Sequence, residues 1–234
     1  MNNLDYEDYL KTLNKISRAI TSDLYLEDIL KLIVTLTANV MKAKVCNVWL
    51  IDDKKQEFNI KATQSMHQEY LNKKTIKLNE GIVGLVAREK KPKIIFDVLK
   101  EEQYKEKKLA RKEGLISMAS IPMMVKDKVI GVLNVYTNKP YEFTKAEITL
   151  LSTIANQAAV AIEKTELIVR TKIIQEELDT RKKTERAKGI LMEERNINES
   201  EAFSLIRKSS MDKRISMKEI AEAIILSYEI RQIK

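Results

Sequence analysis

The spacing of apolar side chains changes along the chain, and each change marks a different kind of element. Residues 10–34 carry leucine, isoleucine and valine at i, i+3 and i+4 spacings, which are typical of amphipathic helices. From residue 45 onward, apolar and polar positions roughly alternate and β-branched residues are frequent, which predicts strands. We expect these strands at residues 45–51, 58–63, 93–96, 117–124 and 129–137.

Short polar segments at residues 52–55 and 126–128 separate neighbouring strands, as the turns of β-hairpins do. This order of elements predicts a mainly antiparallel sheet with helices packed on it, which is an α+β fold. The glycines and prolines also divide the chain, because after Pro140 only Gly189 remains. The rest of the chain is therefore expected to be almost entirely helical.

A long helix is expected to begin after Pro140. Thr144 and Glu147 have the spacing of a capping box, and no stop signal follows for about 50 residues, a helix of about 70 Å. Apolar residues recur every seven positions along it, and two more are offset by three: Ile148, Ala155, Ile162 and Val169, with Leu151 and Ala158. This repeat predicts a two-stranded coiled coil and hence a homodimer, with a single helix packed on its own domain as the alternative.

The C-terminal segment has the pattern of a small helical bundle. Asn198 with Glu201, and Ser216 with Glu219, mark the starts of two further helices behind the end of the long one. Apolar positions on all three helices can form one core, although so small a bundle is only marginally stable alone. Dimerisation through the long helix would support it.

Composition excludes several classes of function. The single cysteine, Cys46, cannot form an internal disulfide, and the chain shows neither a signal peptide nor a long apolar run, so a cytoplasmic protein without a membrane segment is expected. With one histidine, His67, the chain lacks the usual ligand set of a zinc site and a histidine-assisted nucleophile. We therefore expect neither a metal site nor enzymatic activity. The formal net charge of +8 suits a polyanionic partner.

The first 165 residues resemble the GAF family of small-molecule sensors. The resemblance is carried by residues 79–98, which read NEGIVGLVAREKKPKIIFDV, and by the last expected hairpin, with SIPM at 120–123 and VIGVLNV at 129–135. It implies a ligand pocket between the sheet and a variable layer, here residues 67–74 and 98–115. Candidate pocket residues are Trp49, His67, Met118 and Met123, and Trp49, Met118 and Met123 could instead be ordinary core. The cysteines of the family's tetrapyrrole-binding and methionine-sulfoxide-reducing members are missing, so no certain cofactor is expected, only an unidentified small effector.

Residues 172–229 resemble the ANTAR domain of bacterial transcription antiterminators. Three segments carry this resemblance, AKGILM at 187–192, EAF at 201–203 and RKSSMD at 207–212, and IA at 220–221 closes it. It implies binding to paired small hairpins in nascent leader RNA, which prevents a terminator from forming.

The cations of this segment favour the same partner. Arg181 and Lys188 lie within about 20° of each other on a helix, on the side assigned as opposite to the apolar positions, flanked by Lys182 and Arg186. Gly189 costs about 1 kcal/mol relative to alanine in mid-helix, which the close approach of RNA or of another helix would explain. The RNA-binding candidates are Arg181, Lys182, Arg186, Lys188, Gly189, Arg207, Lys208, Ser209, Lys213 and Arg214.

We expect contacts to the RNA backbone and to hairpin shape rather than base stacking, because Phe203 and Tyr228 are the only aromatic residues of the segment. The cations could also be an ordinary solvated face.

Taken together, the sequence predicts three parts: a GAF-like sensor domain at 1–165, a helical stalk at 144–180 that overlaps it, and an ANTAR domain at 172–234. The interpretation is a signal-responsive RNA-binding antiterminator that is homodimeric and gated by a small ligand. The alternative is a dimeric sensor whose helical C-terminus binds DNA or a protein partner. Against a DNA-binding helix-turn-helix, the joint at 212–215 lacks a glycine.

Overall fold

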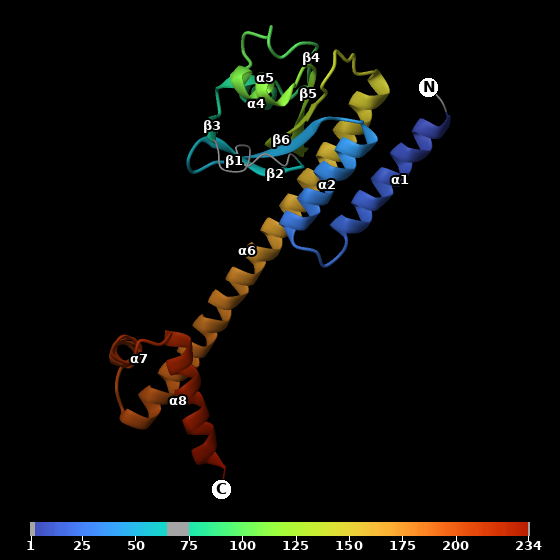
Figure 1. Ribbon diagram of the computed structural model, residues 1–234. Helices are drawn as coiled ribbons and strands as arrows, with labels where there is room; N and C mark the ends of the chain where they lie inside the picture. Colours follow the sequence, from blue (N-terminus) through green and yellow to red (C-terminus); the bar gives the residue numbers. More distant parts are fainter. Residues whose placement is uncertain (1–2, 65–74, 234) are drawn as a thin grey trace. The chain divides into compact units, whose positions relative to one another are not determined.

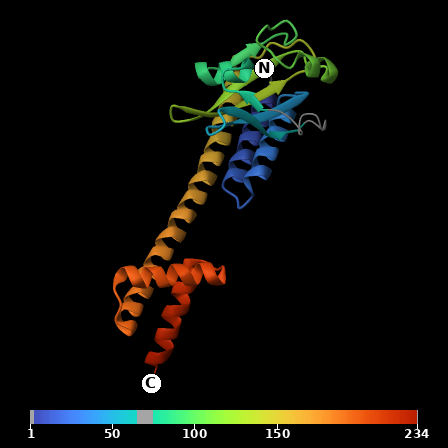
Figure 2. The ribbon, with the colours of Figure 1, turned by 90° about the vertical axis from the view of Figure 1, so that its left-hand side faces the viewer.

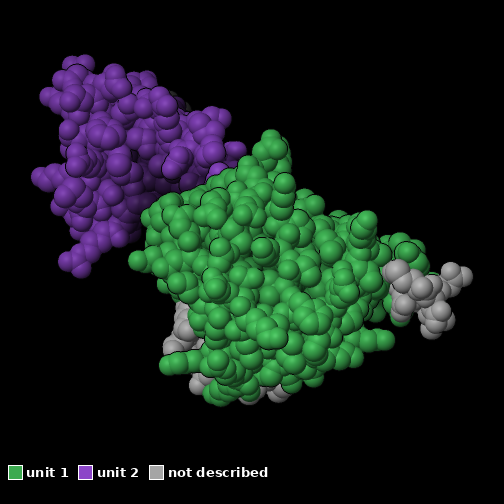
Figure 3. Space-filling model, turned by 90° about the horizontal axis from the view of Figure 1, so that it is seen from above, with its two compact units in different colours: residues 1–165 green, residues 166–234 purple. Residues whose placement is uncertain are grey.

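The computed structural model describes residues 3–64 and 75–233 of the chain. They form two compact units, which we call the sensor unit (Met1–Thr165) and the C-terminal unit (Glu166–Lys234), coloured separately in Figure 3. Each unit has its own hydrophobic core.

The sensor unit is built on one antiparallel sheet in the order β3-β2-β1-β6-β5-β4. The strands are β1 (Val45–Asp52), β2 (Glu57–Thr63), β3 (Thr75–Lys77), β4 (Lys93–Ile95), β5 (Met118–Val125) and β6 (Lys128–Tyr136). The α+β fold and the expected strands are confirmed to within about two residues at each end. Only β3 was not expected, because a strand of three residues with one apolar side chain is too short to show alternation.

Helices cover both faces of this sheet. On one face lie α1 (Asn3–Ile20), α2 (Leu26–Val40) and the first part of α6, and on the other lie α4 (Gly81–Glu89) and α5 (Lys107–Glu113) (Figure 1). Successive residues of a strand point to opposite faces, so Val48 and Leu133 face α2 and α6, whereas their neighbours Trp49 and Val132 face α4 and α5. The strand register thus decides which side chains can line a site under α4 and α5.

The long helix α6 runs from Lys145 to Arg195 and begins as expected. The backbone N–H of Thr144 donates to Glu147 Oε2 at 2.8 Å, and Glu147 N–H donates back to Thr144 Oγ1 at 3.3 Å, which is the reciprocal pair of a capping box. No helix in the residues that the structure describes is both long and apolar enough to cross a membrane.

The residues assigned to the coiled-coil seam of α6 need a correction. Leu151, Ala155, Ala158 and Ile162 are buried in the core of their own sensor unit, and Ile148 packs against that core. A helix that packs on a sheet presents an apolar stripe of period 3.6, and over a few turns this cannot be distinguished from the 3.5 period of a coiled coil. These side chains therefore serve the sensor core, whereas Val169, the last residue of the predicted repeat, is 53% exposed.

The C-terminal unit contains the last part of α6 together with α7 (Glu199–Lys213) and α8 (Met217–Gln232). Both expected capping boxes are present, at Asn198 with Glu201 and at Ser216 with Glu219. Figure 2 shows α7 lying across α6. The core between the three helices contains Ala187, Ile190, Leu191, Ala202, Ile206, Ile220, Ala221 and Ile225.

Candidate ligand pocket and nucleic-acid interface

A cavity of about 360 Å³ lies in the sensor unit between the sheet and the layer of α4 and α5. Its volume is at the lower end of the range for small-molecule sites, about 300–1,000 Å³. Its walls are mainly apolar, and its rim is formed by α5 and the residues just before it. The position matches the pocket that the GAF resemblance implies.

The four candidate pocket residues have different outcomes. Trp49 and Met118 line the cavity. Met123 does not, because it is fully buried in the core on the opposite face, under α2 and α6. Met118 and Met123 are an odd number of positions apart on β5, so alternation alone would have separated them. His67 lies outside the described residues.

A polar strip on the cavity floor was missed from the sequence. Asn47, Asn134 and Ser120 are adjacent across β1, β6 and β5, since Asn47 pairs with Asn134 and Asn134 with Ser120. Both asparagines line the cavity and are almost completely buried. The signal that could have revealed them is a polar residue inside an otherwise apolar strand.

Each asparagine uses its oxygen and leaves its amide nitrogen without a hydrogen bond. Trp49 Nε1 donates to Asn47 Oδ1 at 2.9 Å, and Ser120 Oγ donates to Asn134 Oδ1 at 2.7 Å. The Nδ2 atoms of Asn47 and Asn134 are buried and have no partner. Unpaired buried donors are costly and rare, so they mark this floor as a place for acceptor atoms.

The rim of the cavity is rich in lysine. Lys105, Lys108 and Lys112 line it, and Glu106 is the one acidic side chain among the lining residues that the structure describes. Tyr104 also lines it, and burial raises the pKa of its phenol, so the hydroxyl stays neutral. The rim thus presents positive charge above an apolar wall and an amide floor.

The single cysteine cannot take part in chemistry at this cavity. Cys46 belongs to the core on the opposite face, next to Asn47 in sequence but pointing away from it. Burial raises the pKa of the Cys46 thiol, which keeps it protonated. Among the residues that the structure describes, no group of histidine, cysteine, aspartate and glutamate side chains could hold a metal ion.

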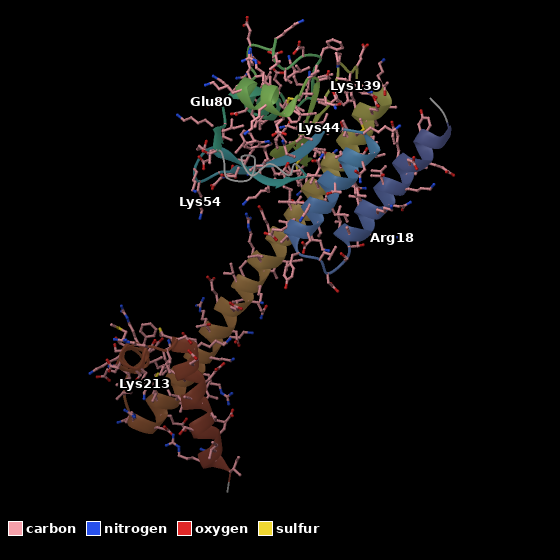
Figure 4. All side chains as sticks on the ribbon, in the orientation of Figure 1. Arg18, Lys44, Lys54, Glu80, Lys139 and Lys213 are labelled. Atoms are coloured by element: carbon pink, nitrogen blue, oxygen red, sulfur yellow. The ribbon has the colours of Figure 1, made fainter. Side chains whose placement is uncertain are left out.

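In the C-terminal unit, six of the candidate cations are exposed and make no ion pair within the described part of the chain. They form two groups, and no hydrogen bond or ion pair joins one group to the other. The first is Arg181 and Lys182 on α6, and the second is Arg207, Lys208, Lys213 and Arg214 at the end of α7, where Lys213 is labelled in Figure 4.

Two other candidates are engaged in ion pairs. Lys188 Nζ lies 2.8 Å from Glu185 Oε1 and 2.6 Å from Glu199 Oε1, and its side chain is only 8% exposed. Glu185 and Glu199 raise the pKa of Lys188, and Lys188 lowers that of Glu199. Arg186 Nη2 is 2.7 Å from Glu229 Oε1 on α8, at a more exposed position.

The assignment of Lys188 to a solvent-facing stripe is therefore corrected. On a helix, Lys188 is next to Ala187 and one turn from Leu191, so it lies at the flank of the apolar face rather than opposite it. Two helices pack on this part of α6, and the buried arc widens until it includes Lys188. The side chain ties α6 to the first turn of α7.

A second ionic cluster joins α6 to the start of α8 and was not expected. Asp179 Oδ2 lies 2.9 Å from Lys183 Nζ and 2.7 Å from Lys218 Nζ, and Lys183 Nζ lies 2.6 Å from Glu222 Oε1. Hydrogen bonds from Lys218 and then Lys183 lower the pKa of Asp179, while Glu222 and then Asp179 raise that of Lys183. Much of the charge of α6 thus holds the bundle together.

The remaining candidates lie where a partner could reach them. Ser209 and Lys213 line a groove of about 670 Å³ between α6, α7 and α8 that also contains Arg195 and Arg231. Gly189 is exposed, and a Cβ built on it would meet no other atom within 4 Å, so packing in this unit does not require glycine there. Arg214 has a φ of 55°, a left-handed conformation that favours glycine.

Comparison with known families agrees with this division of the chain. The model of the GAF domain matches residues 24–163, and the model of the ANTAR domain matches residues 173–225. The first match covers more than half of the chain.

Individual relatives match one unit or the other. The phosphoenolpyruvate-dependent phosphotransferase system protein of Escherichia coli K12 is 27% identical over 158 residues, which are 68% of this chain and 21% of that protein. The transcriptional regulatory protein PdtaR of Mycobacterium tuberculosis is 42% identical over 52 residues, 22% of this chain and 25% of that protein. This chain thus spans about a fifth to a quarter of the length of these relatives.

Solved structures resemble the sensor unit. The GAF domain of an Acinetobacter phosphoenolpyruvate-protein phosphotransferase has a TM-score of 0.61 and 28% identity, covering 73% of this chain and 99% of that one. A free methionine-R-sulfoxide reductase of Neisseria meningitidis also has a TM-score of 0.61, at 14% identity and covering 72% and 95%, which shows the shared fold alone.

The pocket between sheet and helices, the exposed cations of the terminal bundle and both family matches lead to one assignment. The chain belongs to the GAF domain family and carries an ANTAR domain behind its GAF domain.

Proposed function

We propose that this protein is a transcription antiterminator that binds paired hairpins in nascent leader RNA and is gated by a small ligand in the GAF pocket. It acts as a homodimer, so that each ANTAR domain takes one hairpin. The observation that carries the proposal is the pair of exposed, unpaired cation groups on the ANTAR domain, at Arg181 and Lys182 and around the end of α7.

Phosphate binding requires cations that are not already neutralised. The C-terminal unit has nearly as many acidic as basic side chains, so its net charge alone gives little attraction for RNA. Several of the acidic residues form ion pairs within the bundle, with Lys183, Lys188, Lys218 and Arg231. The cations left free are therefore locally concentrated, which is the footprint of a phosphate-binding surface.

Exposed apolar residues on α6 support the homodimer. Val160, Leu167 and Ile174 are spaced by seven and are each more than half exposed, and Leu178 follows one turn later at 47%. Seven-residue spacing places them on one line along the helix. This line, rather than the residues buried in the sensor core, is the seam we assign to the dimer.

Ligand control would act through the sheet. Asn134 and Tyr136 of β6 line the pocket, whereas the residues that alternate with them, Leu133 and Val135, lie in the core with Leu151, Ala155 and other residues of α6. A ligand that favours one arrangement of β6 would therefore favour one arrangement of α6. Binding two hairpins at once gains from effective concentration, so a change in the dimer's geometry can alter RNA affinity strongly.

Fluorescence anisotropy with a two-hairpin leader RNA, each hairpin alone and a duplex DNA of equal length tests the RNA proposal. Arg181→Ala/Lys182→Ala and Arg207→Ala/Lys208→Ala remove one cation group each, and Lys172→Ala removes an exposed lysine elsewhere on α6 as the matched control. We expect each double variant to weaken RNA binding about tenfold or more, since a charge-assisted contact is worth about 1.5 kcal/mol. The slope of log K against log salt should fall by up to about two.

The control should bind like the unmodified protein. Equal affinity for hairpins and duplex DNA would instead support the DNA-binding alternative. RNA binding that none of the cation variants weakens would contradict the proposed interface, and a protein partner bound independently of salt would favour the remaining alternative.

A further inference from the structure

We infer that the GAF pocket takes a small organic acid with oxygen acceptors at both ends, one for the amides of Asn47 and Asn134 and one, negatively charged, for the lysines of the rim. This inference names the class of effector for the pocket and so rests on the proposed function.

The floor of the pocket selects for an acceptor. The indole N–H of Trp49 can only donate, so the atom that it meets at 2.9 Å must be the carbonyl oxygen of Asn47. This fixes the amide's orientation and leaves its NH₂ group without a partner inside the protein. A ligand atom that satisfies this group has to be an oxygen or nitrogen with a free lone pair.

A second donor strengthens this selection. Asn134 is the direct partner of Asn47 in the register of β1 and β6, and its oxygen accepts from Ser120 at 2.7 Å. Side chains directly opposite each other in an antiparallel pair lie close together on one face, so the amide groups of Asn47 and Asn134 are neighbours on the cavity floor. Adjacent donors of this kind suit a carbonyl or carboxylate oxygen, and they would leave an amine or methyl group unsatisfied.

The middle of the pocket is apolar. Trp49, Ile82, Leu109 and Met118 line it between floor and rim. With a volume of about 360 Å³, near the lower end of the range for ligand sites, the cavity suits a small ligand with a short carbon skeleton.

The rim selects for negative charge. Lys105 and Lys108 line this rim, are exposed and have no ion pair in the described residues. Ionised groups on a ligand gain from such a rim because charge-assisted hydrogen bonds are about twice as strong as neutral ones. A cationic ligand would be repelled at the same place.

The experiment uses the full chain and its own reporter, because Trp49 is the single tryptophan and lies in the pocket. The probes are the dicarboxylates glutarate, adipate and pimelate. Hexanoate, which lacks the second acceptor, and hexane-1,6-diamine, which reverses the charge, are the comparison compounds. Tryptophan fluorescence and titration calorimetry are measured up to about 10 mM, a range that captures millimolar complexes. We expect at least one dicarboxylate to bind at least tenfold more tightly than hexanoate, and the diamine not to bind.

Two variants separate the floor from the rim. Asn134→Leu removes one unpaired buried donor but also leaves the buried Ser120 hydroxyl without its acceptor, so we expect little net change in melting temperature while the dicarboxylate binds at least tenfold more weakly. Lys108→Glu reverses a rim charge and should weaken binding similarly, whereas Arg111→Glu on the same helix, outside the pocket lining, should not.

The inference is overturned if no dicarboxylate binds better than hexanoate and the diamine, or if Asn134→Leu binds as the unmodified protein does. RNA anisotropy on the same preparation, without any dicarboxylate, tests the proposed RNA binding independently of the ligand class. RNA binding without dicarboxylate binding would refute only the ligand class, and dicarboxylate binding without RNA binding would refute the RNA proposal.

Discussion

Lys188 and Gly189 are neighbours on α6, yet their surroundings differ completely. Lys188 is held between Glu185 and Glu199, whereas Gly189 faces open space within its unit. The first residue therefore has a structural role in the bundle. The second has no structural reason to be glycine, which points to contact with a partner.

Gly189→Ala separates stability from binding. Because the added methyl group meets nothing and alanine has the higher helix propensity, we expect the free energy of unfolding to rise by about 1 kcal/mol. If RNA approaches this surface closely, the same variant binds hairpins more weakly. Circular dichroism melting and anisotropy measure the two effects. A more stable protein with unchanged RNA affinity would remove Gly189 from the interface.

The Lys188 cluster should give the bundle a defined pH dependence. The pKa of Glu199 is lowered in the folded state, so its contribution is present above the ordinary carboxyl pKa of 4.5 and is lost as the pH falls below it. The pKa of Lys188 is raised, so its contribution is present below 10.5 and is lost as the pH rises through the higher folded value.

Lys188→Met tests this linkage. We expect a lower melting temperature near neutral pH, and an NMR titration should show the pKa of Glu199 rising toward its ordinary value. A Glu199 titration that is the same in both proteins would show that the ion pair is not formed in solution.

For single residues, sequence reasoning failed where more than the local pattern had to be considered, such as strand parity, the register between strands, or the number of helices that pack on one helix. Trp49 and Met118 line the cavity, but Met123 was assigned without checking its strand parity against Met118. Asn47 and Asn134 were missed because each looks like a single polar interruption until the register of β1 and β6 brings them together. Lys188 was misplaced because the sequence does not show how many helices pack on α6.

Among the elements, α6 has two different apolar surfaces. One surface, which contains the buried apolar residues between Leu150 and Ile162, faces the sensor core. The other is an exposed line through Val160, Leu167 and Ile174. The long helix could be predicted from the capping box and the missing breakers, since both are local signals. Which of its apolar lines is covered could not be predicted, because this depends on the sheet beside it.

The exposed line on α6 makes a prediction about assembly. Leu167→Asp/Ile174→Asp places charges in the proposed dimer seam, so we expect a monomer by sedimentation or light scattering. Val169→Asp changes another exposed apolar residue on a different side of the helix and should leave the dimer intact. A dimer that persists in the double variant would move the interface elsewhere.

In the whole molecule, one helix, α6, connects the GAF domain to the ANTAR domain. The GAF domain contributes a small pocket with an amide floor and a basic rim, and the ANTAR domain contributes exposed cations. The antiparallel sheet, both caps of the bundle and the domain types follow from patterns in the sequence, whereas the order of the strands was not predicted. The ion pairs of Arg186 and Lys188, which are half of the candidate cations on α6, could not be predicted. They depend on how α7 and α8 pack on α6.

Comparing paired with single hairpins tests the central claim most directly. By anisotropy, the unmodified protein should bind a two-hairpin RNA at least about a hundredfold more tightly than either hairpin alone, the gain expected from linking two sites. Leu167→Asp/Ile174→Asp should lose that gain while keeping its affinity for a single hairpin. Equal affinity of the unmodified protein for paired and single hairpins would contradict the account.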